Sequence, residues 1–400
     1  MKKIFFVAIA ATLLAAGCQK TEVLNQVNPV DGTSMTFAPN MGKLTKAAES
    51  AGMENLQSQN FRLWAYYVAA DPNRGAEANS IYDGMENIAV TYGTEGWSTS
   101  PVHFWPGKGK QLKFFAVSAD LDTYGAENSK STDAENGTKV SITADENGGT
   151  LTVTDFVVSN TAPDVDLMIA DYATGQQKNG TEGSNDVNLK FRHALAKVEF
   201  WYANASAPEA NPENDPNAVI VQYMYVSNVI NKGSVSVSNQ AATLPITAWD
   251  QSDAATDKVR FSGDYNGSST TVPAVSEIDE AENIEQFVGE GKGKADVPTG
   301  YEMLLTKAPQ KYTTWLVIPQ TVATSKEDAA GLKVEIAYLI GKRQFVASFP
   351  LYADNAAAWN PNQYIKYNIS LSPNMIGFKP TVQEWETTSG PDKDGNVDID

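Results

Sequence analysis

Residues 332–339 read LKVEIAYL, and this stretch decides the fold class. Its apolar residues Val334, Ile336 and Tyr338 alternate with other residues at a period of two. Successive side chains of a β-strand point to opposite faces, so this period predicts a strand with one buried face. Residues 364–371 (YIKYNISL) show the same alternation less cleanly.

Working outward, short apolar runs separated by Gly, Asn, Asp and Pro clusters fill the chain beyond residue 34, which is typical of an all-β protein. The other predicted strands are Phe61–Val68, Gln111–Val117, Thr150–Val158, Val187–Trp201, Val219–Val229, Ser234–Val237, Tyr312–Ile318 and Gln344–Leu351. Helical signal is scarce and favours Thr45–Leu56 and Glu277–Gly289.

A Gly- and Asn-rich stretch, residues 170–186, precedes a strong predicted strand and indicates a domain boundary near residue 188. We therefore predict an all-β fold of two tandem β-sandwich (transthyretin-like) domains, residues 35–187 and 188–400.

The composition removes several classes of function. The chain has 400 residues, and 30 Lys+Arg against 48 Asp+Glu give a formal net charge of -18, which would repel a nucleic-acid backbone. His103 and His193 are the only histidines and Cys18 is the only cysteine, whereas most nucleophilic and zinc chemistry uses these residue types. Enzymes whose catalytic groups are carboxylates are not excluded by this count, so a carboxylate glycosidase stays open as a hypothesis for the function. No pair of acids stands out among the 48.

The first residues form an export signal. Lys2 and Lys3 precede an apolar run, Ile4–Ala16, that is too short to span a bilayer, so residues 1–17 are interpreted as a signal peptide. The run ends in LAAGC, which resembles the bacterial lipobox, with the usual Leu one place further from Cys18. We predict a diacylglycerol on Cys18 and a lipid-linked tether over residues 18–34. The alternative is an ordinary secretory cleavage site with an incidental cysteine.

Several blocks, in order along the chain, carry a family resemblance: FWPGKG with LKFFA (104–116), DLMIA (166–170), VNLKFRHALAKV (187–198), WNPNQY (359–364), IGF (376–378) and VQEW (382–385). They resemble the fimbrillin family, the lipoprotein subunits of the type V pili (fimbriae) of Bacteroides-like bacteria. The resemblance implies a structural subunit without catalysis, located at the cell outer membrane and in the fimbrium. It also implies assembly with other pilus subunits into a head-to-tail polymer.

The resemblance further implies how assembly works. A trypsin-like protease removes an N-terminal strand, and a neighbour's strand fills the vacated groove. Residues 34–39 (SMTFAP) are the expected removable strand, and Lys46–Ala47 is similar to the processing site, with Lys where Arg is common. Lys43 is an alternative cut, and Lys46 as a solvated lysine stays open, as does an uncut, lipid-retaining anchor subunit.

The remaining candidate residues have structural interpretations. His103 and His193 are expected to pack or cap rather than bind a ligand, and Trp64, Tyr66, Trp201 and Trp315 are expected in cores. The acidic tail, residues 392–400, lacks the Gly placement and closing Glu of a calcium loop, so no metal or cofactor is predicted. The tail is also a weak candidate for a donor strand, because Val397 and Ile399 are its only two apolar residues. The alternative function is a monomeric surface glycan-binding lipoprotein or tip adhesin, with a host or bacterial surface ligand.

Overall fold

The computed structural model describes residues 32–41, 46–107, 109–118, 138–158, 165–171, 173–176, 186–238, 249–251, 258–263, 303–325, 328, 330–341, 343–352, 357–372 and 375–384. Cys18, the acidic tail and the predicted helix at residues 277–289 lie outside these ranges.

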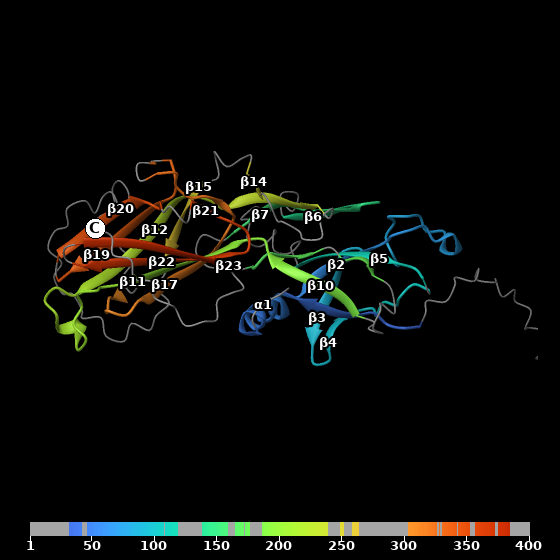
Figure 1. The fold of residues 1–400 in the computed structure, drawn as a ribbon, viewed down its shortest axis with the longest axis horizontal. Helices are drawn as coiled ribbons and strands as arrows, with labels where there is room; N and C mark the ends of the chain where they lie inside the picture. Colours follow the sequence, from blue (N-terminus) through green and yellow to red (C-terminus); the bar gives the residue numbers. More distant parts are fainter. Residues whose placement is uncertain are drawn as a thin grey trace, which may run out of the picture.

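The prediction of an all-β fold of sandwich domains is confirmed, with two lobes side by side along the longest axis (Figure 1). The first lobe is built on an eight-stranded sheet, here called the β5 sheet. In spatial order its strands are β1 (Thr36–Asn40), β10 (Asp186–His193), β8 (Met168–Asp171), β5 (Leu112–Ser118), β2 (Phe61–Tyr67), β3 (Ile88–Gly93) and β4 (Gly96–Thr99), with β9 (Ala173–Gln176) also pairing β5.

A four-stranded sheet, here called the bridging sheet, joins distant parts of the chain. Its order is β14 (Trp249–Asp250), β13 (Lys232–Ser238), β7 (Gly148–Val157) and β6 (Lys139–Asp145). The β6–β7 hairpin precedes β10 in the chain, whereas β13 and β14 follow it, and β7 and β13 pair directly. Figure 1 shows this sheet above the β5 sheet and reaching toward the second lobe.

The second lobe is a sandwich of two sheets. The β11 sheet runs β17 (Gln310–Val317), β11 (Ala196–Ala203), β22 (Gln363–Ser372), β23 (Met375–Glu384). The β12 sheet runs β15 (Lys258–Gly263), β12 (Val219–Ile230), β19 (Lys333–Ile340), β20 (Arg343–Pro350), and β16 (Met303–Leu304) pairs β12. A two-stranded pair, β18 (Gln320–Thr321) and β21 (Ala358–Trp359), completes the β-structure among the described residues.

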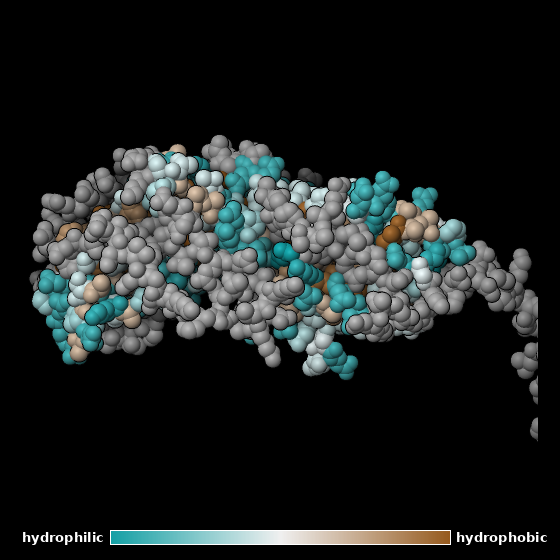
Figure 2. Space-filling view, viewed as in Figure 1, coloured by the Kyte–Doolittle hydropathy of each residue, from teal (hydrophilic) through white to brown (hydrophobic). Residues whose placement is uncertain are grey.

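The two faces of the β5 sheet bury two different cores. One face, with Trp64 and Phe115, packs on the bridging sheet and belongs to a cluster that continues between the two sheets of the second lobe. The other face, with Phe61, Phe114 and Phe191, encloses a separate cluster, here called the β1 core. In Figure 2 the described surface on view is mostly hydrophilic or neutral, with apolar colour in scattered spots.

One predicted strand is corrected. Residues 187–201 are two strands, because the chain turns at Ala194 and Leu195, so that β10 joins the β5 sheet and β11 joins the β11 sheet. The expected domain boundary at 187/188 falls inside β10, which pairs with β1 and β8. We propose that the division follows His193 instead.

A single α-helix, α1 (Lys46–Gln59), is present among the described residues, close to the predicted 45–56. Its sequence, KAAESAGMENLQSQ, contains no proline and no β-branched residue, so little opposes helix formation except Gly52. The helix ends at Asn60, which adopts the left-handed conformation (φ 61°) and donates its N–H to the Leu56 carbonyl at 2.8 Å. Leu56 is fully buried and anchors the helix.

Candidate functional site: the groove that holds the first strand

The segment 33–40, which contains β1, is hydrogen-bonded to two other segments of the backbone. On one side it runs parallel to β10, with Phe37 opposite Val187. On the other side Met35 N–H donates to the His103 carbonyl at 2.8 Å, and Trp105 N–H donates to the Thr33 carbonyl at 3.0 Å. The segment 103–105, which follows β4, therefore pairs with the residues just before β1, whereas β10 pairs with β1 itself, the edge strand of the β5 sheet. We call these two segments the walls of the groove that residues 33–40 fill.

The side chains of residues 35–37 alternate between the β1 core and solvent. Met35 and Phe37 are 5% and 6% exposed, Thr36 between them is exposed, and Met41 is 1% exposed. The Phe37 ring meets the edge of Phe61, with centroids 6.5 Å apart. The predicted strand at residues 34–39 is thus found, with its apolar face inward.

The floor of the groove is aromatic. Phe61 lies 5.0 Å from Trp97 and 5.2 Å from Phe191, measured between ring centroids. Burying a large apolar side chain stabilises by about 1.5–3 kcal/mol, so Met35, Phe37 and Met41 together contribute on the order of 5–9 kcal/mol. Whatever replaces β1 must supply comparable apolar contact and pair with both walls.

The predicted processing residues lie directly after this strand. The structure places Lys46 and Ala47 at the beginning of α1, six residues after the end of β1 at Asn40. Farther along, α1 is held to the body: Asn55 Nδ2 donates to Asp166 Oδ2 at 3.3 Å, and Asp166 N–H donates to Gln59 Oε1 at 3.1 Å. A cut at Lys46 would separate β1 from the chain and leave these helix contacts on the body side.

Both histidines are buried beside carboxylates. His193, 1% exposed, places Nδ1 2.9 Å from Asp166, which is 3% exposed. His103, 7% exposed, lies 3.8 Å from Asp83. The packing and capping roles expected of them fit these positions, since His193 links the end of β10 to the helix contact at Asp166, and His103 lies in the second wall of the groove.

The outer face of the β11 sheet carries a polar network around Glu199. The Glu199 carboxylate accepts hydrogen bonds from Trp201 Nε1 at 2.8 Å and from the Tyr364 hydroxyl at 2.7 Å. Burial alone would raise the pKa of Glu199, but these hydrogen bonds and the nearby Lys197 and Lys311 together hold it below its usual value.

Trp201 corrects one expectation. Trp64, Tyr66 and Trp315 are buried as expected of core residues, but Trp201 is only half-buried. Its ring lies on the outer face of the β11 sheet, under the Lys366 ammonium at 4.0 Å from the ring centroid. The alternation along β11 places Trp201 on the same face as Glu199, opposite to Phe200.

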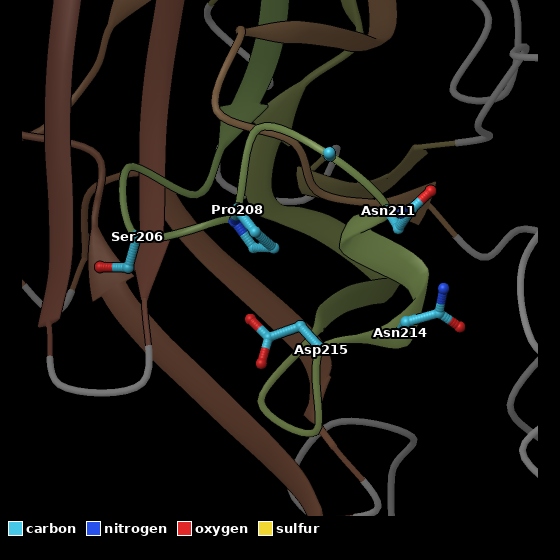
Figure 3. A pocket seen from close by; sticks show the side chains of 6 residues that line it. Ser206, Pro208, Asn211, Asn214 and Asp215 are labelled. Carbon is cyan, nitrogen blue, oxygen red and sulfur yellow. The ribbon is translucent and has the colours of Figure 1, made fainter.

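A shallow cup of about 440 Å³ lies in the connection between β11 and β12 (Figure 3). It is lined by Ser206, Pro208, Ala210, Asn211, Asn214 and Asp215. Asp215 Oδ1 accepts the Asn217 N–H at 2.9 Å, so this carboxylate already has a structural role. The lining holds no histidine, lysine or cysteine, and it offers no paired nucleophile and base.

Two kinds of feature are absent from the described residues. No group of three or more His, Cys, Asp or Glu side chains within the described ranges is arranged to hold a metal ion. In the same ranges no helix combines the length and apolar character needed to cross a membrane. Cys18, the predicted lipid site, lies outside them.

The sequence predicted the strand β1 but missed the groove itself, and processing at Lys46–Ala47 stays a prediction. Its walls come from residues 103–105 and 186–190, which are about 70 and 150 positions from β1. A parallel pairing of that separation leaves no local signal in the chain, and only the apolar alternation of Met35 and Phe37 pointed to a strand.

Stacked sheets in two lobes, with an N-terminal strand docked at the edge of the β5 sheet, define an all-β sandwich protein. A fimbrial protein from Bacteroides vulgatus, known from its crystal structure, superposes with a TM-score of 0.54 at 14% identity, covering 88% of this chain and 99% of that one. At this identity the likeness shows the fold alone.

The chain belongs to the fimbrillin-like family, whose sequence pattern matches residues 45–385. The fimbrium subunit Fim1C of Phocaeicola vulgatus is 23% identical over 236 residues. That match covers 58% of this chain and 58% of the relative, so it spans a little over half the relative's length. The tip fimbrial protein Mfa3 of Porphyromonas gingivalis is 11% identical, with a TM-score of 0.32 over 83% of this chain and 96% of that one.

Proposed function

We propose that this protein is a structural subunit of a type V pilus, assembled with other pilus subunits by exchange of its first strand. The observation that carries the proposal is the placement of β1. This strand pairs with β10, the residues just before it pair with residues 103–105, and a short lysine-bearing connection joins it to the docked helix α1. The family match begins at residue 45, beside the proposed cut after Lys46.

Removal of β1 leaves a surface that demands a replacement. The N–H and C=O groups of β10 that pair with β1, and those of residues 103–105 that pair with residues 33–35, would lose their partners, and the sites of Met35 and Phe37 would open to water. Unpaired strand edges beside apolar pockets bind extended chains strongly. The incoming strand must run parallel to β10 and present apolar residues at every second position.

The N-terminal residues give the proposed route of the precursor to the cell surface and the proposed site of its cut. In this proposal Cys18 carries the lipid that brings the precursor to the outer membrane, and a trypsin-like protease cuts after Lys46 at the cell surface. The new N-terminus is Ala47. The cut body then accepts a strand from another subunit, and the fimbrium grows head to tail.

Limited digestion with trypsin tests the proposal. We expect a body beginning at Ala47 that resists further cleavage and forms oligomers, read by N-terminal sequencing and size-exclusion chromatography. A Lys46→Gln variant should shift the cut to Lys43 or abolish it, whereas Lys258→Gln, on β15, should leave trimming unchanged. Trimming elsewhere, or a correctly trimmed body that stays monomeric at high concentration, contradicts strand exchange.

Processing in the cell is tested separately. N-terminal sequencing of the protein taken from intact cell surfaces should report Ala47 for a polymerised subunit. An acylated Cys18 on assembled protein would instead identify an uncut anchor subunit. If the N-terminus is neither Ala47 nor an acylated Cys18, both parts of the proposal are contradicted.

A further inference from the structure

A lysine is buried in the first lobe far from the groove. Lys113, on β5, is 2% exposed, and burial lowers its pKa, partly opposed by the charge of Asp145. Loss of solvation disfavours the protonated form of a lysine amine and so favours the neutral, nucleophilic form. Because solvent does not reach this amine, the partners open to it are groups of its own chain.

The amine contacts a side-chain amide. Lys113 Nζ is hydrogen-bonded to Asn79 Oδ1, and it also donates to the Asp145 carbonyl oxygen at 2.5 Å. The Asn79 carboxamide carbon, Cγ, is bonded to the oxygen that Nζ contacts. Among the described contacts of Lys113, this is the one side-chain carbonyl carbon within its reach.

The backbone fixes this arrangement. Lys113 lies opposite Tyr66 in the β2–β5 ladder, and Tyr66 bridges to Ile81 on its other side. Asn79 N–H donates to the Tyr67 carbonyl at 2.9 Å, which holds residues 79–81 alongside β2. Asn79 and Lys113 therefore reach toward each other across one strand.

The surroundings limit the proton chemistry. Burial, reinforced by the charge of Glu86, raises the pKa of Tyr66 to about 12, so its phenol stays neutral at ordinary pH and is no base. Asp145 is the carboxylate whose charge acts on Lys113, and its backbone already holds the amine.

We propose that Lys113 and Asn79 join in an intramolecular isopeptide bond. The Nζ lone pair forms a bond to Asn79 Cγ, the Cγ–Nδ2 bond breaks, and the nitrogen leaves as ammonia with a proton that came from Nζ. That proton passes directly from Nζ to Nδ2, and no oxidant or reductant is consumed. The product ties β5 covalently to residues 79–81 across β2, and it does not depend on strand exchange.

Peptide mapping of the purified full chain tests the bond directly. Trypsin cleaves after Arg74, Lys108 and Lys110 but not after an acylated Lys113, so the expected product is a branched peptide. It joins residues 75–108 to residues 111–130 and has one ammonia less than the sum of the two. Recovery of all Lys113 in the ordinary peptide 111–113, from protein held folded for several days, overturns the proposal.

Two variants separate this bond from other losses of ammonia. A succinimide at Asn147-Gly148 also releases ammonia, but it stays within one linear peptide and persists in Lys113→Arg. The branched peptide should disappear in both Lys113→Arg and Asn79→Ala. Asp145→Asn removes the charge that favours the protonated amine, so it should not abolish the branched peptide, and the exposed neighbour variant Glu146→Gln should leave it unchanged. A branched peptide that persists in Lys113→Arg would assign the link to other residues and refute the proposal.

Discussion

Replacing Phe37 by alanine probes how firmly the first strand is held. The ring is 6% exposed and packs edge-on against Phe61. Truncation of a buried Phe costs about 3–5 kcal/mol, and we expect the low end, about 3 kcal/mol, because Phe37 lies on an edge strand that can adjust. Since each 1.4 kcal/mol is a tenfold change, the population with β1 detached should rise about 100-fold.

Hydrogen exchange read by mass spectrometry on peptides covering residues 33–41 measures this opening. The control Val102→Ala removes an apolar side chain that is 54% exposed, and it should leave the exchange of β1 unchanged. Trimming after Lys46 gives a further control. It removes the segment that contains residue 37, so the trimmed bodies of Phe37→Ala and of the unaltered chain have the same sequence and should show the same hydrogen exchange. Equal exchange of β1 in Phe37→Ala and the unaltered chain would refute the packing argument.

Three further predictions concern the body. Glu199→Gln should lower the midpoint of thermal unfolding near neutral pH, at a cost of about 1–2 kcal/mol. Because the folded-state pKa of Glu199 is depressed, the stabilisation from its carboxylate is lost as the pH falls through that pKa. The difference in midpoint between the variant and the unaltered chain should therefore shrink in acid, and a difference that stays constant would be contrary evidence. Asp166→Ala removes the hydrogen-bond partner of the buried His193 and of the Asn55 amide on α1. We expect the free energy of unfolding in denaturant to fall by about 1–3 kcal/mol and hydrogen exchange over residues 53–60 to become faster. Protection of these residues equal to that in the unaltered chain would exclude the anchoring role. Gly149→Ala places a Cβ 2.4 Å from a β6 carbonyl oxygen at φ +136°, so it should destabilise by about 1–3 kcal/mol in the same assay, whereas Gly107→Ala, with open space around it, should have little effect; equal costs would argue against the close approach.

Local patterns were sufficient for the strands that have one buried face. The predicted strand at residues 332–339 corresponds to β19, where apolar residues alternate, and the predicted strand at 219–229 corresponds to β12, whose first half is a continuous buried run rich in β-branched and aromatic residues. The hairpin of β3 and β4 was missed, since its exposed Thr91 and half-buried Trp97 give no clear period.

Long-range pairing was beyond a local reading of the chain. The turn at Ala194 and Leu195 separates two apolar strands without Gly or Pro, so residues 187–201 looked continuous. The partners of β1, and the contact of Lys113 with Asn79, depend on which distant segments meet, and a local pattern does not encode that.

The sharing of the bridging sheet between early and late parts of the chain has a consequence for dissection. β12 and β13 follow one another with only Asn231 between them, so one stretch of backbone passes from the second lobe into the sheet that backs the first. A fragment ending after His193 would keep β6 and β7 but lose β13 and β14, and the complementary fragment would carry the reverse. We therefore expect neither fragment to fold alone, and a pulling force on one lobe to reach the other through the backbone that joins β12 to β13.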